Sequence, residues 1–197
     1  MSIPALSLER KIASELYESI QAKQRVIDQE IPTLNQIANV LIETLSRGGK
    51  ILIFGNGGSA ADSQHIAAEL VSRFRRERAA LPAVALTTDT SILTAIGNDY
   101  GFEGIFSRQI EALGRRGDVA LAISTSGNSP NVLKAVKAAR ELGMRTIGFT
   151  GEEGGKLKEC VEICFRVPSR STPHIQEAHI AAAHALCEVI EEALCRA

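Results

Sequence analysis

The most suggestive residues of this chain form a glycine-rich stretch, Gly55-Asn56-Gly57-Gly58-Ser59-Ala60. The stretch follows a short apolar run and leads into a segment whose apolar residues have helical spacing. At such a junction several backbone N–H groups and the positive end of a helix dipole converge, which stabilises an anion placed there. The stretch therefore predicts a cradle for a phosphate group or a sugar.

The same stretch also fits the Gly-x-Gly-x-x-Gly/Ala fingerprint of dinucleotide-binding proteins. That fingerprint requires an acidic residue about 20 positions further on, at the end of the second strand, to bind the ribose. The candidate acidic residue, Asp89, comes considerably later in the chain. The stretch also lacks the lysine of a P-loop, so the sequence favours a sugar-phosphate cradle over a nucleotide site.

A second polar stretch, Ser124-Thr125-Ser126-Gly127-Asn128-Ser129-Pro130, follows another apolar run. Ser129 is a typical N-cap residue and Pro130 a typical first residue of a helix. Capping explains Ser129 alone, whereas four hydroxyl residues occur within six positions. Hydroxyl groups, free amides and a helix dipole in one place indicate a phosphate site.

His65 and Glu69 are four residues apart, which places both side chains on one face of a helix, one turn beyond the glycine stretch. The spacing is equally typical of a surface ion pair and of two groups that act on one ligand. Their position beside the predicted cradle favours the second interpretation.

The last helical segment carries Gln176, Glu177, His179 and His184 among alanines. Gln176 and His184 are eight residues apart, so their Cα atoms are roughly 12 Å apart in a straight helix. One metal ion between them would require both side chains to be extended. His179 lies on a different face from His184, and we expect it either to be structural or to support a residue that binds the ligand.

Two weaker candidates lie between these motifs. Asn98-Asp99 can offer polar contacts to sugar hydroxyls, although such pairs are usually turn formers. Arg73 is the residue of an arginine-rich segment that lies nearest the preceding helix, and it is the residue of that segment that we expect to be able to reach a ligand. The rest of the segment is expected to be a solvated loop or a subunit contact.

Short apolar runs alternate with helical segments through most of the chain. The five runs are residues 50–54, 83–86, 118–123, 145–149 and 161–167. The alternation predicts an α/β fold with a doubly wound, five-stranded parallel sheet flanked by helices. Ligands bind such sheets at the carboxyl ends of the strands, where both polar stretches fall.

Two helices are predicted ahead of the sheet, as an N-terminal helical extension. The first covers residues 5–30, Pro32 interrupts it, and a second helix covers residues 33–46. The apolar stripe of the first helix must be covered, and a neighbouring subunit is a plausible partner. We therefore assign residues 1–47 to oligomerisation, as part of the same domain, and residues 48–197 to sugar-phosphate binding.

The composition is that of one globular domain. The chain has 197 residues, with 22 basic and 23 acidic side chains and a formal net charge of −1. No broad positive field is present to attract nucleic acid or anionic lipid. No apolar run approaches the roughly 20 residues of a membrane span, and the first residues lack the order of a signal peptide, so a cytoplasmic location is expected. The four cysteines are expected to be free thiols that act as small buried hydrophobes.

Taken together, these motifs resemble the sedoheptulose-7-phosphate isomerases, or phosphoheptose isomerases, of the SIS (sugar isomerase) fold family. The resemblance rests on the glycine stretch with Asp62, on His65 with Glu69, on Ser124–Ser129, and on Ile175-Gln176-Glu177 with His184. It covers nearly the whole chain and includes residues 83–102. It implies an aldose–ketose isomerase that acts on D-sedoheptulose 7-phosphate in the first step towards ADP-heptose for lipopolysaccharide or surface glycans.

Carried over position by position, the resemblance implies a homotetramer with sites between subunits. The implied ligands of one zinc ion, Zn(2+), per subunit are His65, Glu69, Gln176 and His184. The implied substrate contacts are Asn56, Gly57, Gly58, Ser59, Glu69, Asn98, Asp99, Ser124, Thr125, Ser126, Ser129 and Gln176. Glu69 and His184 also match the acid/base pair of the family.

Two other functions are compatible with an SIS fold, because fold does not fix function. One is a non-enzymatic tetrameric regulator that associates with the bacterial replication initiator, and the other is an isomerase of a different sugar phosphate. The regulator resembles these isomerases along its length but lacks their acid/base pair. Since Glu69 and His184 are both present, the sequence favours the enzyme.

Overall fold

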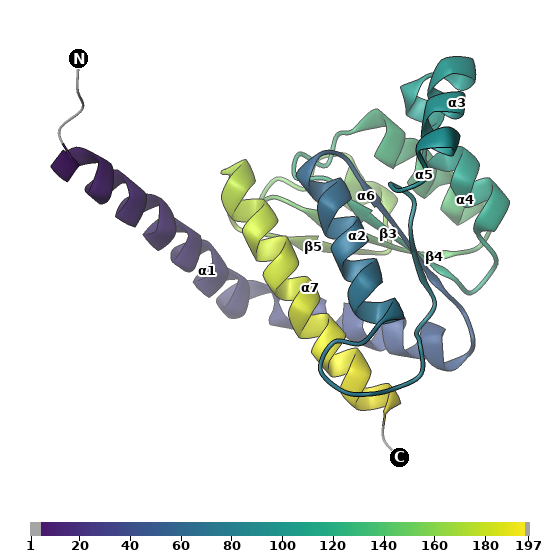
Figure 1. Cartoon of the computed structure of the whole chain (residues 1–197), viewed down its shortest axis with the longest axis horizontal. Coiled ribbons are helices and arrows are strands. Elements are labelled where there is room, and N and C mark those ends of the chain that lie inside the picture. Colours follow the sequence, from purple (N-terminus) through teal and green to yellow (C-terminus); the bar gives the residue numbers. More distant parts are fainter. Residues whose placement is uncertain (1–4, 196–197) are drawn as a thin grey trace.

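The computed structural model describes residues 5–195 and contains one five-stranded, all-parallel sheet (Figure 1). The strands lie in the order β2-β1-β3-β4-β5. Their bounds are β1 Ile51–Gly55, β2 Ala83–Ala85, β3 Val119–Ile123, β4 Arg145–Thr150 and β5 Ile163–Arg166. The predicted fold class is confirmed, and the strand bounds differ from the predicted ones by one or two residues.

Helices cover both faces of the sheet (Figure 1). Their bounds are α1 Ala5–Ser46, α2 Gly58–Val71, α3 Thr90–Tyr100, the short 3-10 helix η1 Phe102–Gly104, α4 Ser107–Leu113, α5 Pro130–Glu141, α6 Leu157–Cys160 and α7 Thr172–Leu194. None of the helices between residues 5 and 195 combines the length and the apolar character that crossing a bilayer requires.

The two faces of the sheet form separate apolar cores, because successive side chains of a strand point to opposite faces. On β1, Ile51 and Ile53 pack into the core that α1, α2 and α7 complete. Leu52 and Phe54 pack into the core that α4 and α5 complete. Burial on both faces explains why the strands are almost continuously apolar in the sequence.

β1 and β3 are neighbours in the sheet. The chain continues from β1 to β2 towards one edge of the sheet and from β3 to β4 towards the other edge, so the direction of winding reverses between β1 and β3. Gly55, the last residue of β1, lies opposite Ile123, the last residue of β3. The loops that follow these two strands therefore start side by side. Such a switch point is where open α/β sheets bind their ligands.

The predicted break at Pro32 is wrong, because α1 is one helix from Ala5 to Ser46. A proline inside a helix removes one backbone hydrogen bond and disfavours continuation. Here Val26 on one side of Pro32 and Ile37 and Leu41 on the other are buried in the same core as the sheet, which holds both halves in helical form. Figure 1 shows the N-terminal half of α1 projecting beyond the rest of the molecule.

All four cysteines are free thiols, as predicted. Cys187 is buried, whereas Cys160, Cys164 and Cys195 are partly buried. Cys164 lies within β5. Burial raises the pKa of the Cys187 thiol to about 12, with the negative charge of Glu69 adding to the effect. Cys187 is therefore protonated at neutral pH, and its thiol is a poor nucleophile.

Candidate active site

The glycine stretch forms the turn between β1 and α2, and glycine is needed at several of its positions. Gly57 has φ of +56°, a region that side chains with a Cβ rarely adopt. A Cβ on Gly55 would lie 2.7 Å from the backbone oxygen of Ile123, and one on Gly58 would lie 2.5 Å from Nε2 of Gln176. The glycines thus allow β3 and the first turn of α7 to approach the loop closely.

Hydrogen bonds join the glycine loop to the start of α5. The side-chain amides of Asn56 and Asn131 exchange two hydrogen bonds of 2.9 Å each. Asn131 also accepts a hydrogen bond from the backbone N–H of Val132 in the first turn of α5. The two polar loops that the sequence singled out are therefore parts of one surface at the carboxyl edge of the sheet.

Ser129 occupies the predicted N-cap position of α5, and Pro130 begins the helix. The Ser129 hydroxyl does not cap the helix, however; it lies 3.0 Å from the hydroxyl of Ser124 in the same loop. The pair places two hydroxyl groups side by side next to the N-terminus of α5, where an anion is favoured.

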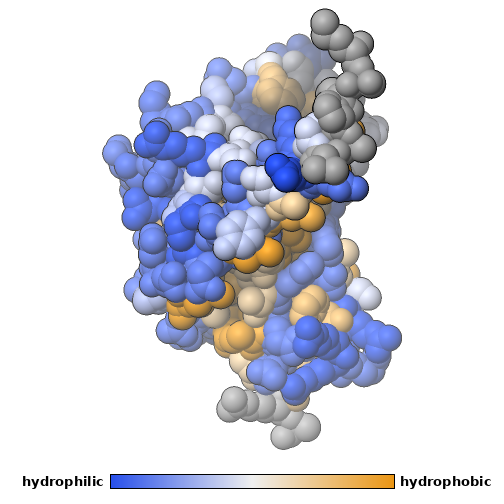
Figure 2. Space-filling view, turned by 90° about the vertical axis from the view of Figure 1, so that its left-hand side faces the viewer, coloured by the Kyte–Doolittle hydropathy of each residue, from blue (hydrophilic) through white to orange (hydrophobic). Residues whose placement is uncertain are grey.

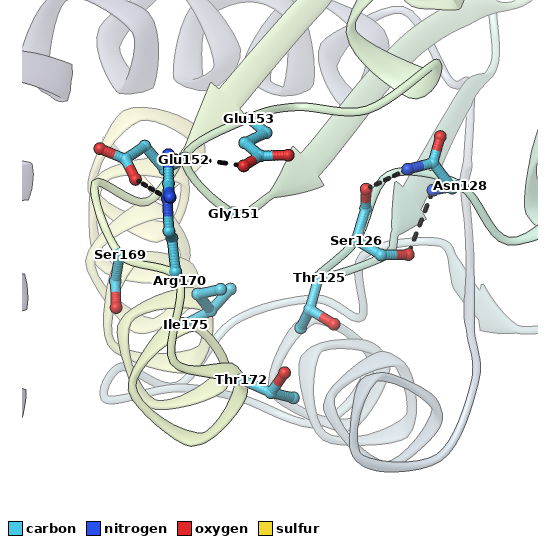
Figure 3. A pocket seen from close by; sticks show the side chains of 10 residues that line it. All are labelled: Thr125, Ser126, Asn128, Gly151, Glu152, Glu153, Ser169, Arg170, Thr172 and Ile175. Carbon is cyan, nitrogen blue, oxygen red and sulfur yellow. Dashed lines mark hydrogen bonds and ion pairs between the residues drawn. The ribbon is translucent and has the colours of Figure 1, made fainter.

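A pocket of about 280 Å³ lies beside this loop at the carboxyl ends of β3 and β4 (Figure 3). Figure 3 shows Thr125 and Ser126 on one side of the pocket and Ser169 and Arg170 on the other. The residues that line it are Thr125, Ser126, Asn128, Gly151, Glu152, Glu153, Ser169, Arg170, Thr172 and Ile175. The serine/threonine loop thus forms one wall of a cavity.

Sequence reasoning missed the opposite wall of this pocket. Arg170 forms ion pairs with Glu152, at 3.0 Å, and with Glu153, at 3.6 Å. Both glutamates directly follow β4, and a search for polar residues after every strand would have found them. Gly151 has a steric role, since a Cβ there would lie 2.9 Å from the backbone oxygen of Thr125.

The third part of the site is a cluster of His65, Glu69 and His184. Nε2 of His65 lies 3.1 Å from Oε1 of Glu69 on α2, and 3.3 Å from Nε2 of His184 on α7. One potential ligand atom from each residue lies within 4.8 Å of the other two. His65 is exposed and the other two are partly buried, so a ligand can reach the cluster.

The cluster has the chemistry and the dimensions of a zinc site. Zinc binds imidazole nitrogen and carboxylate oxygen at about 2.0–2.2 Å in tetrahedral geometry, which separates neighbouring ligand atoms by roughly 3.3 Å. The two shorter separations in the cluster, 3.1 and 3.3 Å, match this value. Gln176, the remaining predicted ligand, lies against Gly58 at the start of α2.

One aromatic side chain, Phe74, and one acidic side chain, Asp62, lie next to the cluster. The Phe74 ring lies 5.6 Å from the His184 ring, centroid to centroid. Asp62 precedes His65 by one turn of α2; burial raises the pKa of its carboxyl group, and the charge of His65 opposes this effect. Oδ2 of Asp62 is buried without a hydrogen-bond partner among residues 5–195.

His179 is buried away from the cluster, in keeping with the structural role expected for it. Its Nε2 lies 3.0 Å from the backbone oxygen of Thr150, and its ring packs against the rings of both Phe149 and Phe165. Burial lowers the pKa of His179 to about 4, although the hydrogen bond to Thr150 opposes the shift. His179 is therefore neutral at pH 7.

The weaker candidates, Asn98, Asp99 and Arg73, pair with neighbours in their own segments. Asn98 and Asp99 lie exposed near the end of α3, and their side chains hydrogen-bond to each other at 2.8 Å. In the part of the chain that the structure describes, neither forms a hydrogen bond to the glycine loop or to the serine/threonine loop. Arg73 pairs with Glu77 in its own segment at 3.3 Å, and within the described residues it forms no ion pair or hydrogen bond with the cluster.

Comparison with known proteins gives consistent matches. The sequence model of the SIS domain matches residues 16–151. The chain is 57% identical over 194 residues to the phosphoheptose isomerase of Roseiflexus sp. (strain RS-1), covering 98% of both chains. It superposes on the phosphoheptose isomerase structure from Neisseria gonorrhoeae with a TM-score of 0.89 and 49% identity, covering 94% of this chain and 99% of that one. The corresponding values for the Francisella tularensis structure are 0.91, 43%, 94% and 98%.

Proposed function

Because this chain belongs to the SIS domain family and is a sugar-phosphate isomerase of the phosphoheptose isomerase type, we propose that it interconverts D-sedoheptulose 7-phosphate and D-glycero-D-manno-heptose 7-phosphate. The observation that carries the proposal is a set of three groups connected through α2: two polar loops at the carboxyl edge of the sheet, and a cluster further along that helix. These groups are the glycine loop, the serine/threonine loop and the cluster of His65, Glu69 and His184. The first two suit a sugar phosphate, and the third suits proton transfer.

The phosphate group of the substrate binds at the serine/threonine loop. Ser124, Thr125, Ser126 and Ser129 offer hydroxyl groups there, and the N-terminus of α5 adds the favourable field of its dipole. Residues 56–59 and Gln176 bind the sugar between this loop and the cluster. Asn98 and Asp99 contact the sugar of a neighbouring subunit, since their own chain leaves them exposed.

An aldose–ketose isomerase must move one proton between C1 and C2 and a second proton between the two oxygens, through an enediol. Glu69 removes the proton from C1 of the ketose and returns it to C2, while His184 transfers the proton between O1 and O2. A well-placed acid or base contributes about 10²–10⁴ to the rate. Both side chains are accessible and lie in one cluster, as this division of roles requires.

The cluster also suits a zinc ion held by His65, Glu69 and His184, one ion per subunit. Gln176 lies against Gly58, about 10 Å along α2 from His65, and would have to extend toward the cluster to become the fourth ligand. When bound, zinc acts as a Lewis acid on the carbonyl and hydroxyl oxygens of the substrate. Glu69 can serve as both ligand and base because its two oxygens differ. Oε1 faces His65, whereas Oε2 has no hydrogen bond within residues 5–195 and remains available to the C1 proton.

We propose that the protein is a homotetramer, as its resemblance to the phosphoheptose isomerases implies, and the exposed apolar surface of α1 supports association between subunits. Leu16, Ile20 and Ile27 on α1 are about 60% exposed, at 63%, 62% and 58%. An apolar groove of about 270 Å³ runs between α1 and α7. Figure 2 shows the apolar surface on this side of the molecule, bordered by hydrophilic residues. A second copy of the chain that covers this surface would remove it from water.

The decisive assay measures the conversion of sedoheptulose 7-phosphate by the purified protein, coupled to a heptose-7-phosphate kinase. Five-, six- and seven-carbon ketose phosphates are compared, and we expect the seven-carbon substrate to have the highest kcat/KM. Preference for a shorter sugar would assign the enzyme to a different substrate. The product then enters ADP-heptose synthesis, for lipopolysaccharide or surface glycans.

Glu69→Gln tests the role of the proposed base, because it keeps the shape of the side chain and removes the charge. Turnover should fall by about 10²–10⁴, while folding and sugar-phosphate binding persist. Near-normal turnover of this variant would exclude Glu69 as the base. Removal of metal by a chelator, followed by elemental analysis and reassay, tests zinc separately; full activity of the metal-free protein would remove zinc from the mechanism.

A further inference from the structure

A buried ion pair lies about two turns of α7 beyond His184, between the loop after α2 and the last turns of α7. Nε of Arg78 lies 3.0 Å from Oε1 of Glu191, and the two side chains are only 4% and 2% exposed. The Glu191 carboxylate also accepts hydrogen bonds from the backbone N–H groups of Phe74, Arg75 and Arg76, at 3.0, 2.8 and 2.9 Å. One carboxylate on α7 therefore organises the whole loop.

Arg78 extends this network to α2. Its Nη2 donates a hydrogen bond of 2.8 Å to the backbone oxygen of Glu69, and its Nη1 donates one of 2.8 Å to that of Leu70. These carbonyls belong to the last turn of α2, where a helix leaves its backbone oxygens without partners. The guanidinium group thus completes the end of α2 at the residue that bears the proposed base.

The network joins the two helices that carry the cluster. Glu191 follows His184 by seven residues, or about two turns of α7, so the two side chains lie on the same face of the helix. Phe74, whose N–H binds Glu191, also places its ring 5.6 Å from the His184 ring. Arg78 and Glu191 therefore restrain the distance between α2 and α7. They also restrain the position of the Phe74 ring beside His184.

A purely stabilising role does not explain such a pair well. Removing two charges from water costs free energy that their attraction repays only in part, so a buried ion pair is a weak contribution to stability. Burial also opposes the ionised form of Glu191, but the three N–H groups and Arg78 outweigh it and hold its pKa below the ordinary value. The pair stays charged and defines one geometry.

We propose that Arg78 and Glu191 are positioning residues for the cluster of His65, Glu69 and His184. They hold α2 and α7 at the separation that keeps Nε2 of His65 and Nε2 of His184 3.3 Å apart. The inference rests on the proposed function of the cluster. In this proposal Arg78 and Glu191 do not contact the substrate. They fix the geometry of the side chains that bind a divalent metal ion and transfer protons.

Two variants of the full-length protein test this role. Arg78→Lys keeps the positive charge but removes the forked donor that binds Glu191 and the Glu69 carbonyl together. The double variant Arg78→Met/Glu191→Leu removes both charges and so avoids leaving one of them buried alone. It keeps the test possible if the single variant does not fold. Far-UV circular dichroism and thermal unfolding establish that each variant is folded.

The matched control is Arg76→Gln/Glu192→Gln. Arg76 and Glu192 form an ion pair of 2.8 Å between the same loop and the same helix, but their side chains are 52% and 50% exposed. Neither side chain reaches the carbonyl groups of α2 among the described hydrogen bonds. The control therefore removes an ion pair of the same kind without releasing the end of α2.

The primary measurement is the affinity of the metal-free proteins for Co²⁺, together with the absorption spectrum of the bound ion. We expect affinity to fall about 10- to 100-fold in both test variants, as for loss of groups that orient metal ligands, with an altered spectrum. The control should match the wild type. Folded test variants with wild-type affinity and spectrum would overturn the proposal.

Crystal structures of the wild type and of the double variant separate this inference from the proposed function. If the wild type does not bind Co²⁺, the proposed metal site fails, but the Nε2–Nε2 separation of His65 and His184 still tests the positioning role. A lengthened separation, with the Phe74 ring displaced from His184, is expected in the variant. An unchanged cluster in the variant would overturn the role of Arg78 and Glu191.

Discussion

Gly58→Ala is expected to separate activity from stability, because it places one methyl group against Gln176. Gly58 is the first residue of α2, and its φ is not positive, so alanine fits the backbone there. The added Cβ would lie 2.5 Å from Nε2, 2.8 Å from Cδ and 3.0 Å from Oε1 of Gln176. Since these atoms form the end of a flexible side chain, the amide group will move and the backbone will not.

The expected change in stability is small. Replacing glycine by alanine at a compatible position stabilises a protein by about 0.4–1 kcal/mol, through the lower entropy of the unfolded chain. The loss of packing around one displaced, half-buried amide offsets this gain. We therefore expect the free energy of unfolding, measured by urea denaturation, to change by less than about 1 kcal/mol.

The expected change in activity is large. If Gln176 binds the substrate or the metal ion, displacement of its amide should lower kcat/KM for the isomerisation about 10- to 100-fold. The same substitution in a Gln176→Ala background should then have little further effect, because the group that the methyl displaces is already absent. Gly97→Ala serves as a control for stability, since a Cβ there meets no atom within 4 Å.

Two results would refute this reasoning. Full activity of Gly58→Ala would show that the position of the Gln176 amide is unimportant for the reaction. An equal loss of activity in the presence and absence of the Gln176 side chain would show that the methyl group acts elsewhere in the glycine loop.

Three further predictions concern other parts of the structure. Ser129→Ala should raise KM for the phosphorylated substrate and lower the stability in thermal unfolding by about 1 kcal/mol, because it leaves the buried Ser124 hydroxyl without its partner and not because α5 loses a cap; an unchanged KM would contradict the assignment of this hydroxyl to the phosphate site. The pKa of His179 is about 4 in the folded state and about 6.5 in the unfolded state. Because the unfolded state therefore takes up the proton first, the free energy of unfolding should decrease by about 3 kcal/mol as the pH falls from about 6.5 to 4. Urea denaturation of the wild type and of His179→Gln over this pH range measures the difference, and parallel profiles would exclude His179 as the cause. Leu16→Glu/Ile20→Glu should dissociate the oligomer in analytical ultracentrifugation, and an unchanged mass would place the interface elsewhere.

Much of the site could be predicted because its motifs are local. Residues 55–60 and residues 124–130 each join a strand to a helix, so turn chemistry and the helix dipole identify them without tertiary contacts. The spacing of His65 and Glu69 likewise places both on one face of α2 within four residues. Alternating apolar runs were sufficient for the parallel sheet, since such strands are buried on both faces.

Other features depend on contacts between residues far apart in the sequence. The continuity of α1 through Pro32 results from packing against the sheet, which outweighs the local preference of proline. The wall of the pocket formed by Glu152 and Arg170 depends on which loops meet at the carboxyl ends of β4 and β5. Neither residue belongs to a motif.

The sequence by itself determined the fold class, the two polar loops and the shared helix face of the candidate residues His65 and Glu69, because each follows from the periodicity or the turn chemistry of a short segment. Only the tertiary structure decided that His184 meets His65 at 3.3 Å across 119 residues of chain. Only the tertiary structure decided that Arg78, in the loop after α2, and Glu191, on α7, join these two helices. Distances of this kind are set by the packing of α2 against α7, which no local pattern encodes.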